Sequence, residues 1–150
     1  MPTLYMLVGV PGSGKTTWIK NNKHDAVVLS TDNYIERAAE KHGKTYSEVF
    51  QDTIGYATEQ MEKDLLQAVR NERDIIWDQT NLTAKARKSK LSRVPKSYKK
   101  VGVYFSVPQD LRDRLASRPG KTIPEPVILS MINQLQPPTK EEGFDEILAV

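Results

Sequence analysis

GVPGSGKTTW, residues 9–18, is the stretch that decides the fold of this 150-residue chain. Gly9 and the run Gly14–Thr16 match the pattern G-x-x-x-x-G-K-[ST] at every fixed position. Glycines let the backbone turn tightly, so that successive N–H groups can point at phosphate oxygens. Lys15 can reach the β- and γ-phosphates of a nucleotide, and the Thr16 hydroxyl can bind magnesium. The stretch therefore predicts a phosphate-binding loop for a nucleoside triphosphate.

The flanks of this loop agree with that interpretation. Residues 3–8 (TLYMLV) form an apolar run typical of a strand, and TTWIK can begin a helix whose N-terminus faces the phosphates. We expect ATP to be bound by the loop residues Gly9, Pro11, Gly12, Ser13, Gly14, Lys15, Thr16 and Thr17.

Composition narrows the class of protein. The length suits one domain over residues 1–150, and no repeat, low-complexity tract or linker divides it. The chain has no cysteine, which excludes disulfide, iron–sulfur and zinc–thiolate chemistry. The lack of a membrane-length apolar run or a signal-peptide pattern predicts a cytoplasmic protein without a membrane partner. A net charge of +3 permits a nucleic-acid partner without requiring one.

Short apolar strands alternate with helical segments along the chain. Thr83 can cap a basic helix ending near Arg93, and further helices open at Pro108 and Pro124. This alternation predicts an α/β fold with a parallel sheet covered on both faces. We expect the strands at residues 3–8, 26–30, 74–77, 101–107 and 146–150.

A long helical pattern follows the second strand. Thr45 and Glu48 have the spacing of a capping box at the start of a helix. Apolar residues then recur every three or four positions, which predicts a core-facing stripe and not a binding face. These residues are Phe50, Ile54, Ala57, Met61, Leu65 and Val69.

Acidic side chains follow two of the strands. Asp32 lies in STDNY, directly after the second strand, and Asp78 begins DQTN after the third. Ligands of parallel sheets bind beyond the carboxyl ends of the strands, so we expect both side chains beside the phosphates. Each carboxylate can bind magnesium or accept a proton from an attacking hydroxyl, and the sequence leaves these two roles open. A helix N-cap or a turn is the alternative for each.

Three arginines lie in the segment LRDRLASRPGKTIP, residues 111–124. Arg114 and Arg118 share a helical face because of their four-residue spacing, whereas Arg112 points elsewhere. Arginines on a segment that can close stabilise the charge of a transferring phosphoryl group. The alternative is a solvent-exposed charge cluster.

These segments together resemble the 5'-hydroxyl polynucleotide kinases, both the phage enzymes and the kinase domain of animal polynucleotide kinase-phosphatase. PGSGKTTW is similar to their phosphate loop, TDNY to the segment that holds the general base, and DQTNL to their D-x-T-N segment. Their lid arginines fall on Arg114 and Arg118. The tail PPTKEEGFDEILAV, from residue 137, is similar to the end of the animal kinase domain.

The resemblance implies a three-layer P-loop NTPase fold of the kinase type, with a central parallel sheet and a helical lid. It implies transfer of the γ-phosphate of ATP, with Mg²⁺, to a hydroxyl, most directly the 5'-hydroxyl end of DNA or RNA. The general base of the family falls on Asp32, and the resemblance implies that the strand before Asp32 runs beside the phosphate-loop strand. On this basis the catalytic residues are Lys15, Asp32, Arg114 and Arg118; Arg118 also binds nucleotide; Thr16 and Asp78 bind the metal; and Asp32, Asp78, Thr80, Asn81 and Arg87 bind the acceptor.

One position departs from the phage members. They carry an arginine directly after the Tyr of the base segment, where it contacts the acceptor's phosphate, and this chain has Ile35. Either the acceptor differs, or a basic residue from elsewhere takes this role. The candidates are Arg37 and the cluster Lys85, Arg87, Lys88 and Lys90, which could follow a nucleic-acid backbone or form a solvent-exposed helix face.

Three classes of function follow from the sequence. The first is a polynucleotide 5'-kinase, and the second is a kinase for another hydroxyl, such as a modified DNA base, a nucleoside or a small metabolite. The third is an ATPase or nucleotide-binding module, because DQTN also resembles the P-loop domains of certain nuclear RNA-binding proteins. His24 and His42 lack metal-ligand spacing and are expected on the surface, and no sequence feature specifies an oligomeric state.

Overall fold

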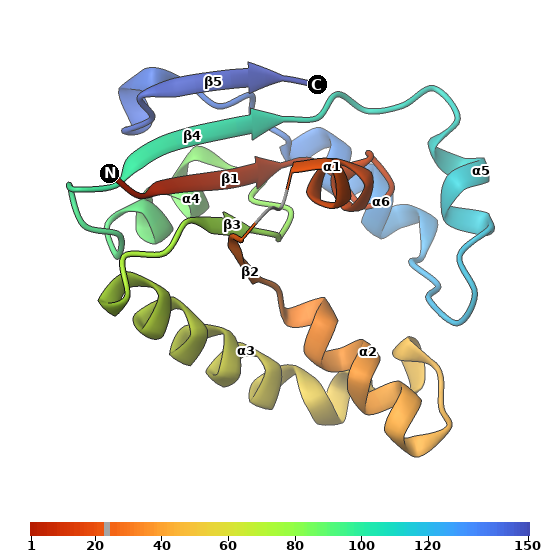
Figure 1. Ribbon diagram of the computed structural model, residues 1–150. Helices are drawn as coiled ribbons and strands as arrows, with labels where there is room; N and C mark the ends of the chain where they lie inside the picture. The colour runs from red at the N-terminus through yellow and green to blue at the C-terminus, as the bar shows by residue number, and fades with distance from the viewer. Residues whose placement is uncertain (23–24) are drawn as a thin grey trace.

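The computed structural model describes residues 1–22 and 25–150, so His24 lies outside the described part. Five parallel strands form one sheet in the order β2-β3-β1-β4-β5 (Figure 1). Their arrows in Figure 1 point toward the end of the molecule where α5 lies. The strands are β1 (Thr3–Val8), β2 (Val27–Leu29), β3 (Ile75–Trp77), β4 (Lys99–Tyr104) and β5 (Glu146–Ala149).

The position of β2 corrects one expectation. β2 does not run beside β1, because β3 lies between them. All three residues of β3 are fully buried, as a central strand of a parallel sheet requires, whereas two of the three in β2 are partly exposed and suit an edge. Asp32 therefore reaches the site from the edge strand, at the start of α2.

The helices begin and end with local signals that the sequence carries. Gly43, with φ of 64°, ends α2, and the capping box of Thr45 and Glu48 begins α3 as predicted. β4 ends at Tyr104, earlier than expected, because its pairing with β1 stops at Val8. The helices are α1 (Lys15–Asn22), α2 (Thr31–His42), α3 (Tyr46–Arg70), α4 (Ala84–Leu91), α5 (Leu111–Ala116) and α6 (Glu125–Gln134), with a 3-10 turn η1 (Lys140–Glu142).

Helices cover both faces of the sheet. On one face, Met61 and Leu65 of α3 and Leu91 of α4 pack on β1 and β3. On the other face, Trp18 and Ile19 of α1 pack on β1, β3 and β4. Below the edge strand β2, helices α2 and α3 pack side by side (Figure 1). In the described part of the chain, no helix is long and apolar enough to cross a membrane. The three-layer α/β fold predicted from the sequence is confirmed.

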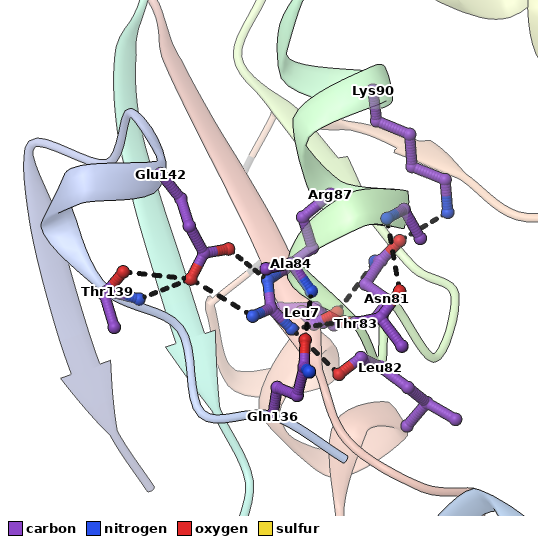
Figure 2. Close-up of polar contacts among 11 residues, drawn as sticks. Leu7, Asn81, Leu82, Thr83, Ala84, Arg87, Lys90, Gln136, Thr139 and Glu142 are labelled. Atoms are coloured by element: carbon purple, nitrogen blue, oxygen red, sulfur yellow. Dashed lines mark hydrogen bonds and ion pairs between the residues drawn. The ribbon is translucent and has the colours of Figure 1, made fainter. Parts of the chain in front are cut away.

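Arg87 of α4 lies inside the protein. Its Nε is 2.6 Å from Oε1 of Glu142 and its Nη2 is 3.1 Å from Oε2, while Nη1 donates to the carbonyls of Asn81 (2.9 Å) and Leu82 (3.0 Å) (Figure 2). The guanidinium therefore ties α4 to η1 and to the turn after β3. The expectation that Arg87 binds the acceptor is wrong, because its side chain has no exposed surface.

We expect Arg87→Leu to lower the free energy of unfolding by about 3–5 kcal/mol, since it removes the buried guanidinium that pairs with Glu142 and donates to the Asn81 and Leu82 carbonyls. Urea denaturation measures this change. Lys88→Leu, at the exposed neighbouring position, is the control and should change stability by less than about 0.5 kcal/mol. Unchanged stability in Arg87→Leu would contradict the structural role.

Candidate active site

A cavity of about 400 Å³ opens beyond the carboxyl ends of β1 and β3. The phosphate-loop sequence forms one wall, the starts of α2 and of the turn after β3 form another, and the α5–α6 segment lies over it. It is lined by Pro11, Gly12, Gly14, Lys15, Thr16, Thr17, Thr31, Asp32, Asp78, Gln79, Thr80, Arg114, Arg118 and Lys121.

Two glycines shape the loop from within. A Cβ on Gly9 would lie 2.6 Å from Oγ of Ser13 and 2.9 Å from Cβ of Phe105, so only glycine fits there. Gly14 has φ of 106°, a backbone region that favours glycine. The Gly9 N–H donates to the Thr80 carbonyl at 3.0 Å. The loop is therefore held against the turn after β3 in the free protein.

Lys15 crosses the loop it belongs to. Its Nζ donates to the Gly9 carbonyl at 2.9 Å. Burial lowers the pKa of Lys15 to about 8, although the charges of Asp78 and Asp32 work in the opposite direction. Burial of the ammonium costs free energy, and an anion that enters the cavity would offset this cost. The position of Lys15 therefore suits the binding of phosphate.

The Asp32 carboxylate accepts two hydrogen bonds from side chains. Its Oδ1 accepts from the Tyr46 hydroxyl at 2.5 Å, and its Oδ2 accepts from Lys121 Nζ at 2.9 Å. Burial opposes the charged form, but these two hydrogen bonds and the lysine charge hold the pKa of Asp32 below its usual range. These contacts therefore stabilise the charged form of Asp32.

Asp78 differs from Asp32 in its surroundings. Burial raises the pKa of Asp78, and the nearby charge of Lys15 only partly compensates. A cation at this carboxylate would relieve the cost of burying it. The Thr16 hydroxyl and the Asp78 carboxylate line the same cavity and are oxygen ligands, the type that Mg²⁺ prefers when it also binds phosphates. The donor set therefore fits Mg²⁺.

Two of the three arginines in residues 111–124 reach this cavity. Arg114 donates through Nη1 to the Gly12 carbonyl of the loop at 3.3 Å and pairs with Asp110 at 2.9 Å. Arg118 places a buried Nη1 in the cavity wall that has no hydrogen-bond partner among the described residues. A buried guanidinium nitrogen without a partner is an expected feature of a site that binds phosphate.

Arg112 points away, as the helical spacing predicts. Its guanidinium pairs with Glu125 of α6, and its side chain is 82% exposed. It does not line the cavity. The structure therefore separates Arg114 and Arg118 from Arg112 within one short segment.

Thr80 and Asn81 follow Asp78 in sequence but lie differently. Thr80 lines the cavity. Asn81 is 2% exposed, and its Nδ2 donates to the Leu7 carbonyl at 2.8 Å, while Lys90 donates to its Oδ1 (Figure 2). The side chain of Asn81 therefore does not face the cavity, which contradicts its expected contact with the acceptor.

Sequence reasoning missed two residues of this site. Lys121 follows Arg118 by three positions in the segment RPGKTIP, and Tyr46 follows the capping residue Thr45, but the sequence assigned no role to either side chain. Both bind the Asp32 carboxylate. The only signal for Lys121 was its place in the same segment as the lid arginines.

The departure at Ile35 has a structural explanation. Ile35 is fully buried between α2 and α3, where it packs with Ala39, Val49 and Ala57. Arg37, one candidate replacement, lies with its guanidinium carbon 5.0 Å from the centre of the Tyr34 ring. Neither Ile35 nor Arg37 lines the cavity.

The chain has a P-loop NTPase fold of the kinase type. A family model described as AAA domain matches residues 4–138, and the chain belongs to this family.

Solved structures share the fold. The chain in the structure of the Pnkp1/Rnl/Hen1 RNA repair complex has 24% identity and a TM-score of 0.69, covering 96% of this chain and 46% of its own length. A Chloroflexus aurantiacus protein has 18% identity and a TM-score of 0.70, and the match covers 99% of this chain and 84% of that protein's chain. Shikimate kinase from Acinetobacter baumannii, in complex with shikimate, has 19% identity and a TM-score of 0.55, and the match covers 100% of this chain and 84% of the shikimate kinase chain.

This chain thus spans less than half of the matched chain in the RNA repair complex. The similarity confirms, at the level of the fold, the resemblance to polynucleotide kinases noted in the sequence.

We expect Lys15→Ala to weaken ATP–Mg²⁺ binding by about 10- to 100-fold, because a charge-assisted hydrogen bond to phosphate is lost. The fold should be retained, since the lysine is desolvated in the free protein. Calorimetry measures the affinity and circular dichroism the fold. A folded variant with the affinity of the parent would exclude this loop as the nucleotide site.

The lid arginines give a second test with an internal control. Arg114→Ala and Arg118→Ala should each lower the rate of phosphoryl transfer, by up to about a thousandfold if one acts as an arginine finger. Arg112→Ala, in the same segment but outside the cavity, should retain a rate near that of the parent. Full activity in both cavity variants would refute the lid assignment.

Proposed function

We propose that this protein is an ATP-dependent kinase that transfers the γ-phosphate to a hydroxyl, and that the acceptor is the 5'-hydroxyl end of DNA or RNA. The observation that carries the proposal is the Asp32 carboxylate, which Tyr46 and Lys121 hold in the same cavity as the phosphate loop. A nucleotide-binding module has no need of a carboxylate held in this way, whereas a kinase needs one to accept the proton of the acceptor hydroxyl.

In the proposed reaction, the acceptor oxygen loses its proton to Asp32 and forms a bond to the γ-phosphorus. The bond from that phosphorus to the β,γ-bridging oxygen breaks, and ADP leaves with the electron pair. Tyr46 holds one oxygen of Asp32 by donating its hydroxyl proton. Burial raises the pKa of Tyr46, so its hydroxyl stays protonated and remains a donor.

The cations of the cavity have separate tasks in this mechanism. Lys15 lies within the loop and would bind the β- and γ-phosphates. Arg114 and Arg118 also line the cavity and would stabilise the charge that spreads over the transferring group. Thr16 and Asp78 would hold Mg²⁺. When bound, that ion neutralises phosphate charge.

The polynucleotide acceptor is supported by sequence and fold together. Five segments, from the phosphate loop to the tail at residue 137, resemble the polynucleotide kinases in the same order. The similar chain in the RNA repair complex covers 96% of this one.

A second candidate is a kinase for a small hydroxyl compound. The burial of Ile35 favours it, because the position where phage members hold the acceptor's phosphate provides no cation here. The similarity to shikimate kinase is in keeping with such an acceptor.

Asp32→Asn tests the kinase class. The amide has the same size but cannot take the proton, so transfer should fall by roughly a hundredfold to ten-thousandfold, while ATP–Mg²⁺ affinity stays within a few fold. An end-labelling assay measures transfer, and calorimetry measures binding on the same preparation.

Asp64→Asn is the matched control for this variant. Asp64 is also a carboxylate that accepts a tyrosine hydroxyl, that of Tyr34, but it does not line the cavity. It should retain transfer. If binding and transfer fall together in Asp32→Asn, then Asp32 is a metal or structural residue and not the base.

The acceptor is identified with γ-labelled ATP and a panel of 5'-hydroxyl DNA, 5'-hydroxyl RNA, nucleosides, modified-base duplexes and small polyols. We expect label on the 5'-hydroxyl ends. Label only on a small compound would establish the second candidate, and phosphate release without any labelled acceptor would indicate an ATPase.

A further inference from the structure

The loop between α5 and α6, residues 117–124, docks on the start of α3. The Ser47 N–H donates to the Gly120 carbonyl at 3.2 Å, and the Thr122 N–H donates to Oγ of Ser47 at 3.2 Å. Gly120 has φ of 70°, and a Cβ on it would lie 3.0 Å from Cβ of Thr45. The loop therefore approaches this helix closely and in a conformation that favours glycine.

Lys121 extends this backbone contact with its side chain. Its Nζ lies 2.9 Å from Oδ2 of Asp32 and 4.5 Å from the centre of the Tyr46 ring, and the side chain is only 14% exposed. Tyr46, in turn, donates to the other oxygen of Asp32. Three segments that are distant in sequence, the starts of α2 and α3 and the lid loop, therefore meet at one carboxylate.

The same loop carries Arg118, three residues before Lys121. Both side chains line the cavity. The loop position that brings Lys121 to Asp32 is therefore also the position that holds Arg118 in the wall of the phosphate site.

We propose that Lys121 is a positioning residue that couples the lid to the base. While its ammonium holds Asp32, the loop 117–124 stays docked on α3, Arg118 stays at the phosphates, and the base is aimed into the cavity. The role of the base rests on the function proposed above, whereas the docking of the loop through Asp32 does not.

Hydrogen exchange measures the docking directly. Lys121→Met keeps the length of the side chain but removes the charge, so exchange of the amides in residues 117–124 should rise by roughly tenfold or more. Lys121→Arg keeps a charged donor and should restore much of the protection. Lys96→Met is the control, because Lys96 is exposed in the turn before β4, outside the cavity.

A double-variant cycle tests whether Lys121 acts through Asp32. Asp32→Asn should raise exchange of the same loop, and the double variant Asp32→Asn with Lys121→Met should add little, because each change removes the same interaction. Fully additive effects would show that the two residues act independently and would overturn the proposal. So would a parent-like exchange rate in Lys121→Met.

Kinetics supply the readout that a purely structural role would not give. In Lys121→Met, kcat should fall by roughly tenfold or more while ATP–Mg²⁺ affinity stays within a few fold, and Lys121→Arg should recover part of kcat. An unchanged kcat would overturn the coupling to the base. If the parent transfers no phosphate to any acceptor, the proposed kinase function fails, and the exchange measurements still decide whether Lys121 docks the loop.

Discussion

The hydrogen bond from the Asn81 side chain to the Leu7 carbonyl fixes the two strands that carry the site. Asn81 lies four residues after the end of β3, in a segment that begins with Asp78. Its φ is 48°. Leu7 lies in β1, just before the phosphate loop. A buried amide donor without a hydrogen-bond partner costs free energy. This bond is therefore kept, and it sets the spacing between Asp78 and the loop. Asn81 also accepts hydrogen bonds from Lys90, at its side-chain oxygen, and from Arg87, at its main-chain carbonyl. These bonds connect the same turn to α4.

The charges of the cavity follow from this arrangement. Four cations and two carboxylates line it, and the excess positive charge is concentrated in a partly buried space. Burial lowers the pKa of Lys15 to about 8, while the charges of Asp78 and Asp32 oppose this shift. A bound polyanion would therefore be attracted to the cavity by its net positive charge.

Local features of the fold were predictable from sequence, because they depend on neighbours along the chain. The first strand, the loop, the capping box at Thr45 and the cap at Thr83 all lie where their residue types indicate. The separation of Arg112 from Arg114 and Arg118 also followed from helical spacing. The order of the strands could not be predicted in this way, because it depends on contacts between segments that are distant in sequence. The strand that loses more by exposure, β3, takes the place next to β1, and β2 lies at the edge. Arg87 gave no sequence signal of burial, because its partner Glu142 is 55 residues away.

The packing of α2 explains where the cations of the site come from. Thr31, Ile35 and Ala39 are buried at four-residue spacing, so this face of the helix belongs to the core with α3. Asp32, one position further round, is the α2 residue beyond Thr31 that reaches the cavity. An arginine at position 35 would have to bury its charge among apolar side chains, which is costly. The positive charge beside Asp32 is therefore supplied across the cavity, by Lys121 of the α5–α6 loop. The electrostatics around Asp32 therefore depend on the α5–α6 loop and not on the helix that carries the carboxylate.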